Sequence, residues 1–170
     1  MSPDSTVTVD VLVEADGWSV LPDAAGLVEA AVRTACVAAT DDLPSGADIA
    51  VMLTDDAAVR TLNREWRGKD KATNVLSFPA DPDLAPDAGE AHLGDIAIAF
   101  ETLCREAEAE GKTRGHHLSH LAVHGTLHLL GFDHETGEDA EEMEALERRI
   151  LASLGVPDPY LDTELVEQHP

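Results

Sequence analysis

Hydrophobic and polar positions alternate in some parts of the chain and recur at helical spacing in others. Alternating Val, Leu and polar residues near the N-terminus predict a half-buried strand, and shorter apolar runs predict three more. The predicted strands are Thr6–Glu14, Ile49–Leu53, Val75–Phe78 and Asp95–Phe100. The predicted helices are Leu21–Thr40, one from Asp55 or Asp56 to about Trp66, Glu101–Gly111, His116–Leu130 and Asp139–Leu154. This order indicates an α+β fold with one mixed sheet of about four strands and about five helices.

Two segments lack such patterns. Pro79–His92 is rich in Pro, Asp and Ala, which predicts a surface loop. The residues from 157 onward are rich in acidic side chains and begin with Pro157 and Pro159, which indicates a loosely held tail. A length of 170 residues fits one domain, so we expect residues 1–170 to form a single domain with 157–170 as its tail.

Composition narrows the class of protein. Hydrophobic residues make up 44% and charged residues 26%, which excludes disorder along the whole length. No apolar run is long enough to span a membrane, and Met1–Asp10 lacks the basic-then-apolar pattern of a signal peptide. The sequence therefore predicts a soluble protein that is located in the cytoplasm and does not contact membranes.

The charge is strongly negative but unevenly placed. The chain carries 11 basic and 34 acidic residues, a net charge of −23. This charge argues against DNA as a binding partner and against general binding of nucleic acids. Five of the basic residues nevertheless fall within twelve positions; this basic strip consists of Arg60, Arg64, Arg67, Lys69 and Lys71. We expect any anionic ligand to bind there.

A histidine cluster carries the candidate chemistry. Six of the eight histidines lie between positions 116 and 134. On a helix, His124 and His128 are about 40° apart in azimuth and about 6 Å apart in rise, so both can reach one metal ion. Gly131 can end that helix in a left-handed conformation and turn the chain back, which brings His134 to the same ion. Three histidines with one open position are typical of catalytic zinc, so we predict one Zn²⁺ per chain.

The other histidines are predicted to play lesser parts. His120 shares the face of His124 and His128, but three ligands along a straight helix would span about 12 Å, so a supporting role is expected. His116 and His117 open the helix and are expected to be solvated. His92 and His169 are isolated in segments expected to be flexible, and no role is assigned to them.

The histidine spacing also occurs in the metzincin proteases. Their general base is a Glu directly after the first histidine, where this chain has Gly125. Their Met-turn is missing too, because Met143 falls in an acidic helix. Peptide hydrolysis is therefore the weaker interpretation.

Residues 124–134, which read HGTLHLLGFDH, resemble the motif of the YbeY family of bacterial rRNA-maturation endoribonucleases. Similar segments are Leu62–Pro79, Leu93–Ile96, Glu141–Glu144 and Asp158–Tyr160, so the resemblance runs from about residue 62 to 160. The chain departs from the family pattern at Ala72, where Pro is common, and at Asn74, where many members carry Asp. No acid or base role is therefore expected of position 74.

The resemblance implies a single-strand-specific, zinc-dependent endoribonuclease acting in late 16S rRNA 3′-end maturation and ribosome quality control. Its partners would be ribosomal RNA and ribosomal or assembly-factor proteins. The family's metal ligands fall on His124, His128 and His134, and its functionally important arginine falls on Arg67.

Several alternatives stay open at this point. Arg67 could grip a phosphate or form an ion pair with Asp70 or Glu65. Asp133 is a candidate catalytic residue that could orient a ligand or accept a proton, or it could cap the turn after Gly131. The general base is not identified. A non-catalytic ribosome-assembly factor with structural zinc, or a zinc hydrolase of small substrates, is the alternative function.

Overall fold

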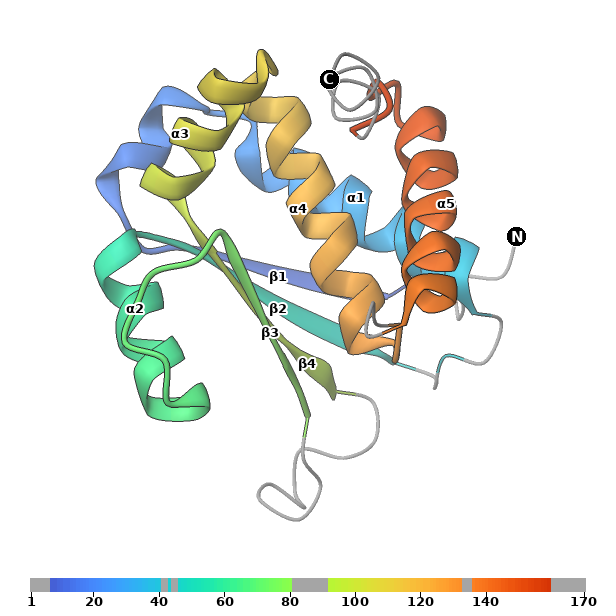
Figure 1. Cartoon of the computed structure of the whole chain (residues 1–170), viewed down its shortest axis with the longest axis horizontal. Helices are drawn as coiled ribbons and strands as arrows, with labels where there is room; N and C mark the ends of the chain where they lie inside the picture. The colour runs from blue at the N-terminus through green and yellow to red at the C-terminus, as the bar shows by residue number, and fades with distance from the viewer. Residues whose placement is uncertain (1–6, 41–42, 44–45, 81–91, 133–135, 160–170) are drawn as a thin grey trace.

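In the computed structural model, one four-stranded sheet is combined with five α-helices and a 3-10 helix (Figure 1). The structure describes residues 7–40, 43, 46–80, 92–132 and 136–159. The strands are β1 (Thr8–Val13), β2 (Asp48–Thr54), β3 (Val75–Pro79) and β4 (His92–Ala99). The helices are the 3-10 helix η2 (Asp16–Val20) and the α-helices α1 (Ala24–Ala39), α2 (Asp56–Arg67), α3 (Phe100–Glu110), α4 (Arg114–Leu129) and α5 (Gly137–Ser153).

The strand order in the sheet is β1-β2-β4-β3. The β1–β2 and β2–β4 pairs are parallel, whereas β3 pairs with β4 in the antiparallel direction. The sheet is therefore mixed, and the predicted α+β fold with four strands and five helices is confirmed. Among the described strands, β3 at the end of this order has one hydrogen-bonded neighbour and so forms an edge of the sheet.

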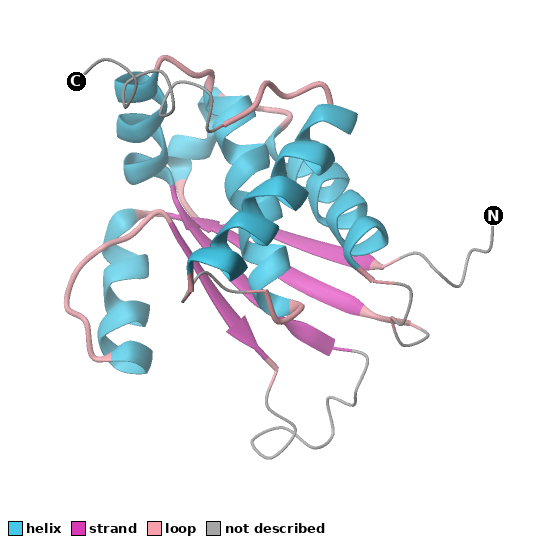
Figure 2. Cartoon of the chain, turned by 45° about the vertical axis from the view of Figure 1, so that its right-hand side comes forward, coloured by secondary structure: helices cyan, strands magenta, loops and turns pink. Residues whose placement is uncertain are grey.

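Alternate residues of β4 face two hydrophobic clusters on opposite sides of the sheet. Ile96 and Ile98 belong to the larger cluster, which also takes in the buried faces of α1, α4 and α5. The smaller cluster consists of Val59, Leu76, Ala97 and Ala99. Because side chains alternate along a strand, α2 covers one face while α1 and α4 cover the other, and α5 packs on the outer side of α1 and α4 (Figure 2).

The helix ends follow from capping chemistry. Asp55 caps α2, since its carboxylate accepts a hydrogen bond from the backbone N–H of Ala58 at 2.8 Å. Gly68, at φ +70°, ends the same helix. Thr113 caps α4 through its hydroxyl, which accepts from the backbone N–H of His116 at 3.0 Å. These short-range contacts explain why the helix boundaries could be predicted closely from sequence.

The predicted surface loop and the predicted C-terminal tail each include an end residue that the structure holds in place. His92 does not lie in a flexible segment: it is the first residue of β4, and its Nδ1 lies 2.5 Å from Oδ1 of Asp48 in β2. The start of the tail is also held, because Pro159 is buried and its carbonyl accepts from Nζ of Lys112 at 2.9 Å. Residues 81–91 of the predicted loop and 160–170 of the tail lie outside the described residues. Within the described part of the chain, no helix is both long and apolar enough to cross a membrane.

Candidate metal centre

Helix α4 ends in the turn that the sequence predicted. The N–H of Gly131 donates to the carbonyl of His128 at 3.1 Å, and the N–H of Phe132 donates to that of Leu127 at 3.0 Å. These two bonds form a Schellman motif, which requires a left-handed residue, and Gly131 has φ +99°. The chain therefore leaves the helix three residues after His128. His134 and Asp133, the predicted third ligand and catalytic carboxylate, lie outside the described residues.

Four histidines form a ladder along one face of α4. The rings of His117, His120, His124 and His128 follow one another with centroid distances of 5.9, 6.2 and 4.6 Å. Their spacing of three or four residues places them on one helical face. The closest step joins the two predicted ligands, whose Nε2 atoms lie 3.0 Å apart.

That separation fits a shared metal ion. Two Zn–N bonds of about 2.0–2.1 Å that meet at a tetrahedral angle place their nitrogens about 3.3 Å apart. The Nε2 atoms of His124 and His128 are within a few tenths of an ångström of this spacing. Imidazole nitrogens that converge in this way form the kind of donor set that zinc prefers.

Glu147 of α5 is a site residue that the sequence analysis missed. Its side chain is 1% exposed, and its two oxygens contact Nδ1 of His124 and Nε2 of His120, each at 2.9 Å. Burial alone would raise the pKa of Glu147, but the hydrogen bonds with His120 and His124 outweigh it and lower the pKa to about 2. An ionised carboxylate can only accept, so both histidine nitrogens donate to it.

This contact fixes the tautomer of His124. With its proton on Nδ1, a neutral His124 presents the lone pair of Nε2 toward His128. Metal-bound histidines usually donate their second ring nitrogen to a carboxylate in this way. The sequence does contain a signal for Glu147, because it falls at helical spacing among the apolar residues of this helix. Those residues are Met143, Leu146, Ile150 and Leu151, and the structure buries Glu147 with them.

His120, His124 and Glu147 also form a group that could itself bind a metal. Their candidate ligand atoms all lie within 4.8 Å of one another. Within the described part of the chain, this is the set of three His, Cys, Asp or Glu side chains that lies close enough together to hold a metal ion. It shares His124 with the His124–His128 pair, and Glu147 contacts Nδ1 of His124 while Nε2 approaches His128.

Ser77 of β3 connects the histidine helix to the basic strip. Its hydroxyl donates to the carbonyl of Gly125 at 2.9 Å, and its carbonyl accepts from Nη2 of Arg67 at 3.1 Å. The guanidinium thus lies at the β3 edge of the sheet, and Ser77 is the residue that links it to α4. The alternative ion pair with Asp70 is not formed, since Asp70 instead contacts Arg60 at 2.8 Å and Arg64 at 3.8 Å.

The position of Gly125 explains why a metzincin-like Glu is missing there. A Cβ on Gly125 would lie 3.1 Å from both Cγ2 of Ile96 and Oγ of Ser77, closer than ordinary contact. This residue faces the sheet, not the histidine ladder, and its small size lets α4 pack closely on β3 and β4. A general base at this position would have no space on that side.

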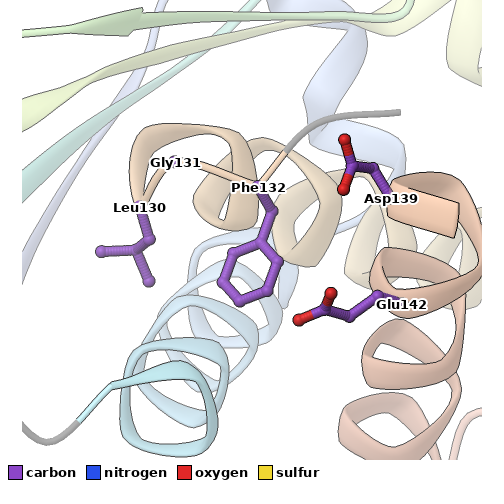
Figure 3. Close-up of a pocket in the computed structure, with 5 residues that line it drawn as sticks. All are labelled: Leu130, Gly131, Phe132, Asp139 and Glu142. Carbon is purple, nitrogen blue, oxygen red and sulfur yellow. The ribbon is translucent and has the colours of Figure 1, made fainter. Parts of the chain in front are cut away.

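A small cavity lies beside the end of α4. It has a volume of about 270 Å³, and its lining residues are Leu130, Gly131, Phe132, Asp139 and Glu142. Figure 3 shows the two carboxylates reaching from α5 toward the turn that follows α4. Acidic groups therefore lie close to the turn from which the chain continues to His134.

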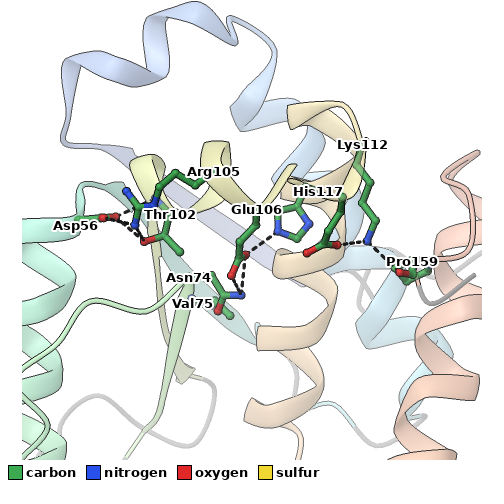
Figure 4. Close-up of polar contacts among 10 residues, drawn as sticks. Asp56, Asn74, Val75, Thr102, Arg105, Glu106, Lys112, His117 and Pro159 are labelled. Atoms are coloured by element: carbon green, nitrogen blue, oxygen red, sulfur yellow. Dashed lines mark hydrogen bonds and ion pairs between the residues drawn. The ribbon is translucent and has the colours of Figure 1, made fainter. Parts of the chain in front are cut away.

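His117 belongs to a second polar network, so the prediction that it is solvated is wrong. Its side chain is 4% exposed, and Nε2 lies 2.8 Å from Oε1 of Glu106 (Figure 4). Glu106 also accepts from the side-chain amide of Asn74 at 3.0 Å. Burial lowers the pKa of His117, although Glu106 opposes this shift. Asn74 therefore joins the start of β3 to α3 and, through Glu106, to α4.

Comparison with known proteins identifies the family. The profile described as "Endoribonuclease YbeY" matches residues 23–155. The chain belongs to this family. A protein named Endoribonuclease YbeY from Azorhizobium caulinodans is 60% identical over 152 residues, covering 89% of this chain and 95% of that protein. One of the same name from Bradyrhizobium sp. strain BTAi1 is 54% identical, covering 97% and 99%. The predicted YbeY membership is confirmed, and its relatives carry the predicted enzyme class in their names.

A solved structure supports the fold. The chain is similar to the solution structure of TM1509 from Thermotoga maritima, with a TM-score of 0.51 and 23% identity. The match covers 86% of this chain and 91% of that one. At this identity, the likeness bears on the arrangement of strands and helices alone.

Proposed function

We propose that this YbeY-family chain is a zinc-dependent endoribonuclease that binds one ion through His124, His128 and His134. The observation that carries the proposal is the 3.0 Å approach of the Nε2 atoms of His124 and His128, together with the occupation of Nδ1 of His124 by Glu147. The turn at Gly131 supports His134 as the third ligand, because the chain leaves the helix just before it. The names of the relatives support the reaction class.

His124, His128 and His134 would hold the zinc ion as neutral imidazoles, so that the ion would keep its full charge and would supply Lewis-acid chemistry toward a phosphoryl oxygen and a water molecule. The chain's own residues prepare the site. Glu147 keeps the proton of His124 on Nδ1, so that Nε2 stays a ligand. Asp133 is proposed to accept a proton or to orient a ligand, and it follows the same turn.

Arg67 is proposed to bind the phosphate of the substrate. Its Nη2 is anchored on the Ser77 carbonyl, and Ser77 contacts α4 directly at Gly125. Arg67 is an exposed residue, and its guanidinium has further N–H groups in a planar fork that suits phosphate oxygens. Lys69 and Lys71, which are exposed nearby, would add general attraction for the RNA backbone.

The proposed substrate is single-stranded ribosomal RNA, with a role in late 16S rRNA 3′-end maturation and ribosome quality control. A net charge of −23 weakens unaided binding to RNA, which supports delivery by ribosomal or assembly-factor proteins. A cytoplasmic location and a single domain over residues 1–170 are proposed with it.

The test measures zinc content and RNA cleavage together. Protein stripped of metal and refilled with one equivalent of zinc is expected to cut a single-stranded rRNA fragment, and His128→Ala is expected to bind less zinc and to be inactive. Zinc retention without cleavage of RNA or rRNA-containing particles would favour the non-catalytic assembly factor. Hydrolysis of a small phosphodiester but no RNA would favour the small-substrate hydrolase.

A further inference from the structure

The two tryptophans of the chain lie in opposite environments. Trp18 is 2% exposed, and its indole N–H donates to the carbonyl of Thr54 at 2.9 Å. Trp66, in the last turn of α2, is 64% exposed. The other large hydrophobic side chains found exposed among the described residues are aliphatic: Leu12, Val13, Val20 and Val37. Trp66 therefore offers a large aromatic surface that folding leaves uncovered.

Trp66 packs against Phe78 on the face of the sheet that α2 covers, at the edge strand β3. Its ring lies 6.2 Å from that of Phe78, centroid to centroid, at an interplanar angle of 59°. Trp66 precedes Arg67 in α2, and Phe78 follows Ser77 in β3. The aromatic pair and the Arg67–Ser77 hydrogen bond therefore connect the same two elements at adjacent positions. Because Ser77 also contacts Gly125, this pair lies next to the link with the histidine helix.

The charges around Trp66 favour a ligand that does not rely on electrostatics alone. Of the five residues in the basic strip, Arg60 and Arg64 already contact Asp70. The net charge of −23 repels a polyanion at longer range. Stacking of a base on an aromatic ring is much less sensitive to salt than a phosphate contact, and every base has a face that can stack.

We propose that Trp66, supported by Phe78, is a stacking platform for one unpaired RNA base whose neighbouring phosphate contacts Arg67. This rests on the proposed function, because the base belongs to the RNA substrate. In a duplex both faces of a base are covered by its neighbours, so the platform binds single strands in preference to duplexes. Trp66 thus acts as a binding and specificity residue that holds the RNA strand at the β3 edge next to Arg67, on the α2 side of the sheet, while the histidines lie on the α4 side.

The test uses metal-free protein, so that binding is measured without cleavage. Fluorescence anisotropy with a labelled single-stranded oligoribonucleotide, and with a duplex of the same sequence, gives both dissociation constants at two salt concentrations. Trp66→Ala is expected to weaken single-strand binding about tenfold at both salt concentrations, and Trp66→Phe is expected to restore most of it. Duplex binding should change less than twofold. The matched control is Val37→Ala, which truncates an equally exposed side chain on α1 and should leave both constants unchanged.

The alternatives give different results. Equal single-strand binding by Trp66→Ala and the unsubstituted protein would overturn the platform, as would an equal loss for single strands and duplexes. No detectable single-strand binding by the unsubstituted protein would overturn it as well, and would leave Trp66 as a surface for a protein partner. The proposed function fails separately, when zinc-loaded protein does not cut RNA while the Trp66 effect on binding persists.

Discussion

Replacement of Glu147 by Gln tests how the candidate metal centre is organised. The substitution keeps the shape of the side chain but removes its charge and turns one oxygen into an N–H donor. At present both oxygens accept from histidines, His120 and His124, at 2.9 Å. A glutamine can accept from one of them, while its NH₂ group faces the other. One histidine must then move its proton to the opposite ring nitrogen or lose its hydrogen bond.

The expected cost follows from the burial of this group. Glu147 is 1% exposed, so water cannot replace a lost partner. A hydrogen bond to a charged group contributes about 1.5–3 kcal/mol, and loss of one of the two should lower the free energy of unfolding by a similar amount. For a chain of this length, that corresponds to a decrease in Tm of roughly 3–12 °C. Loss of a carboxylate that orients a metal-bound histidine typically weakens metal binding by about 10- to 100-fold.

Two measurements separate orientation from general destabilisation. Competition with a chelator gives the zinc affinity, and long-range ¹⁵N–¹H NMR of the metal-free protein reports which nitrogen of His124 carries the proton. The matched control is Glu141→Gln, which removes the same charge from an exposed position of α5. Unchanged zinc affinity in Glu147→Gln, with His124 still protonated at Nδ1, would refute the assigned role of Glu147.

Three further predictions test the turn, the basic strip and the sheet. Gly131→Val should reduce zinc affinity nearly as much as loss of His134, because a β-branched residue is strained at φ +99°. Isothermal titration calorimetry measures the zinc affinity, and an affinity equal to that of the unsubstituted protein would contradict this prediction. Arg67→Ala should retain zinc and Tm but lose most single-turnover RNA cleavage, and Arg67→Lys should recover little. The hydrogen bond with Asp48 raises the pKa of His92, so its protonated form stabilises the fold by up to about 1 kcal/mol. Urea unfolding of His92→Gln should therefore show a lower free energy of unfolding than the unsubstituted protein. The difference should be largest below about pH 6.5 and should disappear as pH rises through the raised pKa of His92. A difference that grows with pH would exclude this pairing.

Local patterns accounted for much of the fold. Hydrophobic periodicity separated strands from helices, and the Gly131 stop followed from its position after His128, because a helix end depends on bonds between residues a few positions apart. The approach of His124 and His128 was likewise predictable, since helical geometry alone places residues i and i+4 side by side. His92 was misassigned because its partner, Asp48, lies on another strand and gives no signal nearby in sequence.

The sequence by itself determined which residues could bind a metal and which segment could attract a phosphate. Tertiary structure alone decided how they are held. Packing of α5 on α4 brings Glu147 to His124 across 23 positions, and pairing of β3 at the sheet edge lets Ser77 contact both Arg67 and Gly125. The physical reason is that helical spacing fixes neighbours on one element, whereas contacts between elements depend on which faces the hydrophobic core brings together.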